Sequence, residues 1–268
     1  MLPHNAFLRR IPNAIELQQR LVYDAIVFAS DSIEWAYDTL GKSALAIVNF
    51  QMGTDDFRRA QSSLFGAAWT IIDNCHALRS ILRQMPLKQG GPTEKFLRDY
   101  EATTCIRNAG DHLANMLPNL AKKKKFIAPI FGVLSFCISM EDDLERRSDG
   151  TVILRKCRGV TVTAGTLVHP KHQFELLNPS GREIEFPAGP FEFQAYDYKV
   201  CLSDLVRDVS KVVTRLNSVV ETAATAQVPG PAKEAGLDPE KVMSEHGGSL
   251  MIVTNILFPA NQDDNTSS

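Results

Sequence analysis

An arginine, an amide and an imidazole occur within six residues, as Arg107, Asn108 and His112. At 100° per residue on a helix, Asn108 and His112 lie on nearly the same face, whereas Arg107 lies about 140° from His112. An imidazole exchanges a proton near pH 7, and a guanidinium is shaped to bind phosphate. Together these residues indicate phosphodiester chemistry or phosphate binding. The alternative is a surface ion pair between Arg107 and Asp111, one helical turn apart, beside an unrelated histidine.

A second polar group precedes the first by about thirty residues in the sequence and also lies on a predicted helix. Asp73, His76 and Arg79 are spaced three residues apart, so they share one helix face. If this helix packs against the next one, the three side chains lie near Arg107 and His112 and contact a substrate or support the motif. The alternative is a hydrogen-bonded polar layer that fixes how the two helices align.

The segment 107–112 resembles the motif of the HEPN superfamily (higher eukaryotes and prokaryotes nucleotide-binding domain): an arginine, usually a polar residue, and a histidine after a short gap. The resemblance covers at most the helical parts of the chain. It implies a four-helix bundle that commonly dimerises, with a cleft where two copies of the third helix meet. Many members are metal-independent endoribonucleases that leave a 2′,3′-cyclic phosphate, and others are catalytically inactive.

The resemblance implies a role for each motif residue. His112 acts as general base or acid on the 2′-hydroxyl or the leaving 5′-oxygen, a chemistry specific to RNA. Arg107 stabilises charge on the phosphate, and Asn108 orients the imidazole or donates to a phosphate oxygen. Asp111, with the group at 73–79, contacts substrate or supports these residues. No metal or cofactor is expected.

Two other functions stay open. A non-catalytic HEPN-like module would bind a nucleotide, RNA or a partner protein, which the near-neutral net charge of -2 favours. A helical scaffold would have no site at all. Bacterial members of the superfamily commonly act in toxin–antitoxin pairs and phage defence, so the expected partners are RNA, a second copy of the chain and an antitoxin or other partner protein.

Composition places the chain among globular proteins. It has 268 residues, of which 44 % are hydrophobic, enough to build a sizeable core. The five cysteines form no CxxC pair, no apolar run has the length of a membrane helix, and the N-terminus lacks a signal-peptide core. We therefore expect a cytoplasmic protein with no membrane contact.

The spacing of apolar residues predicts an α+β fold that is mainly α: a four-helix bundle with an antiparallel β-meander inserted before its last long helix. Three helices, over 13–40, 55–85 and 93–123, form the bundle at 13–125. The apolar segment 43–50 either extends the first helix or forms a separate turn, and Thr54 or Asp55 caps the second. The last helix is 202–226, capped by Ser203. Trp35 and Trp69 are expected in the core. The meander spans 131–198, with these expected strands: 133–140, 151–156, 160–168, 173–177, 183–186 and 191–198.

The remainder, 227–268, is expected to be irregular and partly disordered, because it is rich in proline and glycine at first and in polar residues at its end. Within it, 238–245 is predicted to be a short helix. The apolar segment 249–258 is predicted to be a strand or a docked stretch of chain.

Overall fold

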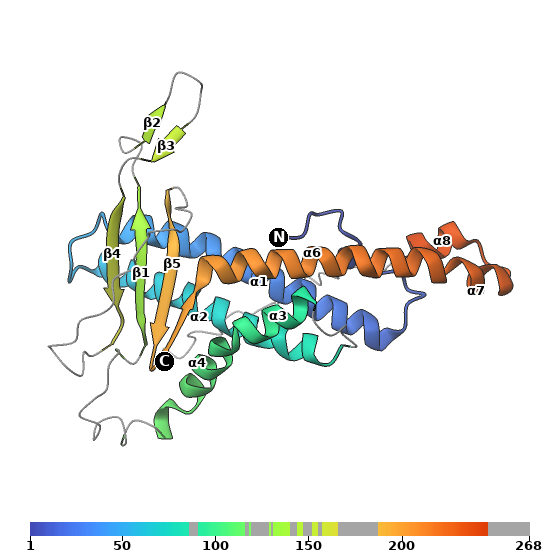
Figure 1. The fold of residues 1–268 in the computed structure, drawn as a ribbon, viewed down its shortest axis with the longest axis horizontal. Coiled ribbons are helices and arrows are strands. Elements are labelled where there is room, and N and C mark those ends of the chain that lie inside the picture. The colour runs from blue at the N-terminus through green and yellow to red at the C-terminus, as the bar shows by residue number, and fades with distance from the viewer. Residues whose placement is uncertain are drawn as a thin grey trace, which may run out of the picture.

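In the computed structural model, long helices lie along one axis, and a small antiparallel sheet covers them at one end (Figure 1). The structure describes residues 1–85, 91–115, 118, 129, 131–139, 144–146, 152–154, 157–165 and 187–245. This mixture of long helices with a small antiparallel sheet confirms the α+β prediction.

The first two helices, α1 (Leu17–Ile47) and α2 (Asp55–Arg83), form an antiparallel hairpin. Of the two predicted caps for α2, Thr54 and Asp55, the structure uses Thr54, whose side chain accepts a hydrogen bond from the backbone N–H of Phe57 at 3.3 Å. The first helix does not end near Gly41; the apolar segment 43–50 extends it as far as Ile47, which was one of the two predicted alternatives for that segment. Gly41 does not adopt a positive φ, and the buried stripe continues past it through Ala44 and Ile47, which keeps the helix intact.

Trp35 corrects a second expectation, because its side chain is 64 % exposed. The core face of α1 is set by Ile26, Ile33 and Leu40, which are spaced seven residues apart and are fully buried. Trp35 follows Ile33 by two residues and therefore lies on nearly the opposite side of the helix. The other tryptophan, Trp69, is partly buried against the core.

The third predicted helix is two helices in the described chain, α3 (Pro92–Asp99) and α4 (Glu101–Asp111). They meet at Tyr100, whose φ of -108° and ψ of 27° are not helical. The buried Tyr100 side chain donates a hydrogen bond to Asp208 at 2.9 Å and packs on Phe96, so tertiary contacts hold the break in place. Residues 113–115 are helical again, and most of 116–128 lies outside the described residues.

The main sheet contains β1 (Val133–Ile138), β4 (Arg158–Thr163), β5 (Ala188–Ala195) and β6 (Tyr198–Cys201), in the order β4-β1-β5-β6. All neighbours are antiparallel, as expected, but the sheet is not a simple meander because β5 pairs with the free edge of β1. A separate hairpin joins β2 (Leu144–Arg146) to β3 (Val152–Leu154). The strands expected at 173–177 and 183–186 lie outside the described residues.

Aromatic side chains of β5 attach the sheet to the helices. Phe193 makes edge contacts with Phe65 and Trp69 of α2, at ring-centroid distances of 6.4 and 5.5 Å. Phe191 contacts Tyr37 of α1 in the same way, at 5.8 Å. The sheet and the helices therefore share one hydrophobic core.

The last long helix, α6 (Leu202–Gln227), follows β6 directly and confirms the prediction of a helix over 202–226. Ser203 is not its cap, because Cys201 occupies the N-cap position. The Ser203 hydroxyl instead accepts a hydrogen bond from the backbone N–H of Phe191 at 3.0 Å and forms a hydrogen bond with the Tyr37 hydroxyl at 2.6 Å. Ser203 thus connects β5, α1 and α6.

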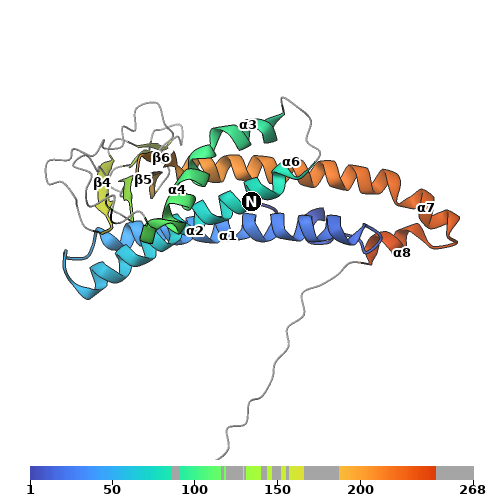
Figure 2. The same ribbon diagram turned by 90° about the horizontal axis from the view of Figure 1, so that it is seen from below.

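Two short helices, α7 (Pro229–Glu234) and α8 (Pro239–Ser244), bring the chain from the end of α6 back to the start of α1 (Figure 2). The helix α8 confirms the short helix predicted at 238–245, whereas α7 was not expected. At the start of the chain, the 3-10 helix η1 (Phe7–Arg9) lies against α6. The apolar segment 249–258 lies outside the described residues.

Candidate functional site

The polar residues singled out by sequence lie where α2 packs against α4. The two helices run antiparallel here. Position 79 of α2 contacts position 101 of α4, position 76 contacts 104, and position 69 contacts 110. The expectation that the group at 73–79 faces the 107–112 segment is therefore met for Asp73, His76, Arg79, Arg107 and Asp111.

Arg79 forms the innermost part of this cluster. Its side chain is fully buried, and its guanidinium donates hydrogen bonds to the Leu97 carbonyl at 2.6 Å and to the Thr104 hydroxyl. It also forms an ion pair with Glu101, which Arg83 contacts at 2.8 Å. Since its bonds reach the end of α3 and the first turns of α4, Arg79 fixes the position of both helices against α2.

His76 lies one turn before Arg79, and its Nδ1 is 3.2 Å from the Thr104 hydroxyl. Burial lowers the pKa of His76, and the positive charges of Arg107, Arg79 and Arg83 lower it further. The ring is consequently neutral near pH 7, so it can accept a proton or a hydrogen bond there.

At the outer end of the cluster, Arg107 forms an ion pair with Asp111. This is the contact that the alternative interpretation of the motif expected. Asp73 of α2 faces the same pair. Shielding from water raises the pKa of the Asp73 carboxyl, the charge of Arg107 opposes this rise, and the charge of Asp111 adds to it. Arg107 is thus close to two carboxylates.

Asn108 and His112 lie at the end of α4 and are exposed. His112 occupies the C-cap position, with φ of -96° and ψ of 10°, so the motif lies at a helix end and not in the middle of a long helix as expected. Among the described contacts, none joins the side chain of Asn108 or His112 to the cluster. The structure therefore brings five of the seven predicted residues together and leaves two at the adjacent surface.

Sequence reasoning missed three members of the cluster, which are Arg83, Glu101 and Thr104. A usable signal was present. Glu101 and Thr104 are three residues apart, and Thr104 precedes Asn108 by four, so all three share one face of α4. Arg83 likewise follows Arg79 by four residues on α2.

The contacts of Trp69 join the cluster to the sheet. Its indole N–H donates a hydrogen bond to the Phe131 carbonyl at 3.1 Å, just before β1. On α4, Gly110 lies so close to the ring that an added Cβ would be 3.3 Å from it. A small residue inside the motif therefore allows α4 to approach α2.

The site gives no sign of metal or cysteine chemistry in the part of the chain that the structure describes. No cluster of three His, Cys, Asp or Glu side chains that could hold a metal ion occurs among these residues. Cys75, next to His76, is buried, and burial raises the pKa of its thiol to about 12, so it carries no thiolate near pH 7. None of the described helices combines the length and the apolar character that crossing a membrane requires.

No protein-family model, curated protein or solved structure matches the chain.

Proposed function

We propose that the chain is a HEPN-like, metal-independent endoribonuclease that cleaves RNA by attack of the 2′-hydroxyl on the neighbouring phosphate. The supporting observation is the position of the motif at the end of α4, where Arg107 is half-exposed and Asn108 and His112 are exposed. All three side chains are thus partly or fully exposed to the solvent from which RNA approaches. The proposed setting is the cytoplasm, in a toxin–antitoxin pair or in phage defence, where an antitoxin or other partner protein restrains the activity.

In this mechanism His112 takes the proton of the 2′-hydroxyl or gives one to the leaving 5′-oxygen. The 2′-oxygen forms a bond to phosphorus as the bond to the 5′-oxygen breaks, which yields a 2′,3′-cyclic phosphate and a 5′-hydroxyl. Arg107 stabilises the negative charge that develops on the phosphate oxygens. For this role the Arg107 guanidinium must leave the Asp111 carboxylate and bind the phosphate. Because the Asp111 side chain is about half exposed, water can solvate its carboxylate after the exchange.

A second imidazole is needed if the proton donor and the proton acceptor are both histidines. His76 is not well placed for that role. It contacts Thr104, which lies eight residues before His112, a distance of about 12 Å along the helix axis. A second copy of the chain is the simpler source, and we therefore include a homodimer in the proposal.

The outer face of α1 supports the homodimer. Leu21, Phe28 and Trp35 repeat every seven residues on this face, and their side chains are 59 %, 71 % and 64 % exposed. Apolar residues with this spacing form the seam along which two helices pack together. The resemblance places the second copy at the third helix, whereas the large exposed apolar side chains lie on α1.

A non-catalytic HEPN-like module that binds a nucleotide, RNA or a partner protein is the second candidate. The observation that favours it is the ion pair between Arg107 and Asp111, with Asp73 facing the same pair. Because carboxylates already occupy the Arg107 guanidinium, it is less able to stabilise the charge that develops on a phosphate during turnover, which favours a module that binds a partner without cleaving RNA.

Incubation of the purified protein with mixed cellular RNA in excess EDTA tests the proposal. We expect the wild type to leave cyclic-phosphate ends and His112→Ala to cleave about 10²- to 10⁴-fold more slowly, the usual contribution of general acid–base catalysis. Arg107→Ala should also cleave slowly. The matched control is His4→Ala, because His4 is exposed and lies near the start of the chain, far in sequence from the motif. Wild-type activity in His112→Ala would contradict the proposal. RNA binding without cleavage, weakened by Arg107→Ala, would establish the second candidate.

A further inference from the structure

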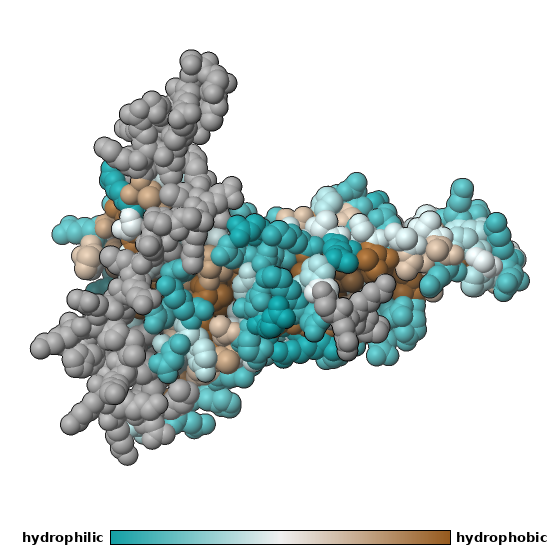
Figure 3. Space-filling model, in the orientation of Figure 1, coloured by the Kyte–Doolittle hydropathy of each residue, from teal (hydrophilic) through white to brown (hydrophobic). Residues whose placement is uncertain are grey.

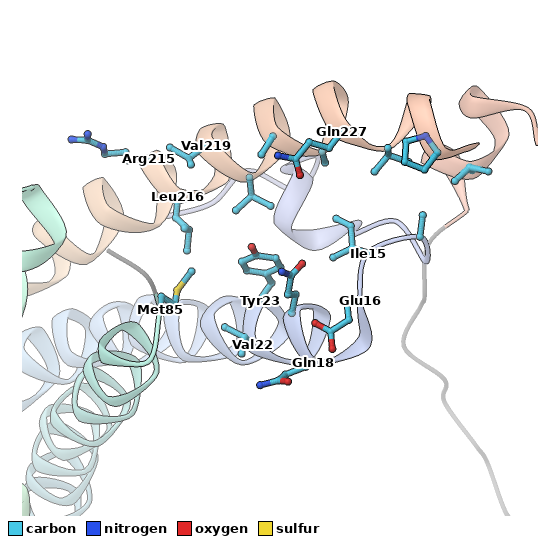
Figure 4. A pocket seen from close by; sticks show the side chains of 18 of the residues that line it. Ile15, Glu16, Gln18, Val22, Tyr23, Met85, Arg215, Leu216, Val219 and Gln227 are labelled. Carbon is cyan, nitrogen blue, oxygen red and sulfur yellow. The ribbon is translucent and has the colours of Figure 1, made fainter. Parts of the chain in front are cut away.

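A large groove runs between α1 and the C-terminal half of α6, far from the 107–112 segment. Its volume is about 1060 Å³. Figure 4 shows Tyr23 and Leu216 pointing into the space between the two helices, with Val22, Met85 and Ile15 around them. Pro231 and Ala232 of α7 and Val242 of α8 belong to the lining of the groove.

The lining of the groove is mostly apolar. Leu216, Val219 and Val220 of α6 contribute to it, and Val219 is 57 % exposed. Hydrophobic surface lies along this part of α6, between hydrophilic surfaces (Figure 3). The charged side chains of the lining, Glu16 and Arg215, are both exposed. Protein interiors leave few voids, and an apolar groove of this size is typical of a binding surface.

The described chain ends beside this groove. The carbonyl of Glu245 accepts a hydrogen bond from the backbone N–H of Asn13 at 2.8 Å. The next residue, Ala14, lines the groove, and so does Val242 on α8. The segment that follows Glu245 therefore starts at the mouth of the groove.

The segment after Glu245 is apolar like the lining of the groove, and it is long enough to span the groove. Residues 246–258 contain no Asp, Glu, Lys or Arg, and 249–258 reads Ser-Leu-Met-Ile-Val-Thr-Asn-Ile-Leu-Phe. Thirteen extended residues span up to about 43 Å. The groove extends along α6 from Arg215 to Gln227, which is about 18 Å of helix. The segment can therefore traverse the whole groove.

From these observations we infer that residues 249–258 dock into the groove between α1 and α6 of their own chain. The alternative occupants, a free apolar ligand and the same segment of a second copy, must bind from solution. The chain's own segment is tethered at the mouth, so its effective concentration is in the millimolar range typical of short linkers. Thr254 and Asn255 lie between the two apolar runs of the segment. Their polar side chains can form hydrogen bonds with the glutamine and tyrosine side chains that line the groove.

Hydrogen–deuterium exchange of the intact chain tests this inference, read on peptides that cover 249–258. In the wild type we expect slow exchange of these amides. Val219→Glu places a charge in the groove and should raise their exchange to the rate of unstructured chain. The matched control is Thr222→Glu, which lies on the same helix, is exposed, and does not line the groove. It should leave the protection unchanged.

Three results would overturn the inference. The first is fast exchange of 249–258 in the wild type. The second is equal protection in all three proteins, which would place the segment elsewhere. The third is protection that falls on dilution, which would show that the segment docks into another copy. A variant with Ile252→Asp and Ile256→Asp provides the reciprocal measurement, because it should raise the exchange of lining peptides around 216–224 and spare α2.

Discussion

Arg79 is a fully buried cation whose partners come from α3 and α4. Arg79→Met would leave the Thr104 hydroxyl and the Leu97 carbonyl without this donor, and we expect it to lower the free energy of unfolding by about 2–4 kcal/mol. Arg83→Met is the matched control, because Arg83 contacts the same Glu101 from a half-exposed position and should cost less than about 1 kcal/mol. Urea unfolding measures both. Equal losses would mean that the buried bonds of Arg79 do not hold α3 and α4 in place.

The histidine beside Arg79 makes stability depend on pH. Because burial and three arginines lower the pKa of His76, the folded state resists a proton that the unfolded chain accepts near pH 6.5. Stability is therefore lost as the pH falls through about 6.5 and continues to fall until the lower folded pKa is passed. His76→Gln should reduce the loss in unfolding free energy between about pH 7.5 and 5.5. His112→Gln, at an exposed position, should retain it. The same pH dependence in both variants and the wild type would contradict the assignment.

At the scale of elements, Gly132 determines how closely β1 approaches β5. Its φ is +102°, and an added Cβ would lie 2.7 Å from the Phe193 ring. We expect Gly132→Ala to destabilise the fold by about 2–4 kcal/mol through backbone strain and overpacking. Thermal or urea unfolding measures this, and tryptophan fluorescence should report it, because Phe193 also packs against Trp69.

Gly159 in β4 provides the control for Gly132. An added Cβ there meets nothing within 4 Å, and its φ is not in the left-handed region. Gly159→Ala should leave stability unchanged or raise it by up to about 1 kcal/mol, since alanine loses less backbone entropy than glycine on folding. If the two substitutions had the same effect, close packing of β1 on Phe193 would not explain the glycine at position 132.

Local signals predicted some elements well and tertiary contacts decided the others. The cap at Thr54 and the apolar stripe of 202–227 depend on neighbouring residues in sequence, and both elements were predicted almost to their ends. The break at Tyr100 depends on Asp208, more than a hundred residues away, so periodicity alone predicted one continuous helix. The partnership of Arg107 with Asp111 followed from their spacing, whereas the burial of Arg79 required knowing that α4 lies across α2.

At the scale of the whole molecule, the core depends on contacts between distant parts of the chain. The hydroxyl of Ser203 was expected to cap a helix but joins Phe191 of β5 to Tyr37 of α1. The sheet order follows the same logic, because β5 completes the edge of β1 only after a long intervening segment. Sequence pattern gives strands and helices, but which strand lies beside which is set by burying Phe193 and Phe191 against the helices.

The outer face of α1 leads to a prediction about assembly. Because Leu21, Phe28 and Trp35 expose large apolar surfaces at a seven-residue spacing, we expect the chain to be a homodimer at micromolar concentration. Replacing Phe28 and Trp35 together by Glu puts charges on the seam and should yield a monomer with an unchanged circular dichroism spectrum, since neither side chain belongs to the core. Thr222→Glu, on an exposed face of α6, should remain dimeric. Sedimentation velocity distinguishes these states. A monomeric wild type, or a dimer that persists in the double variant, would remove α1 as the dimer surface.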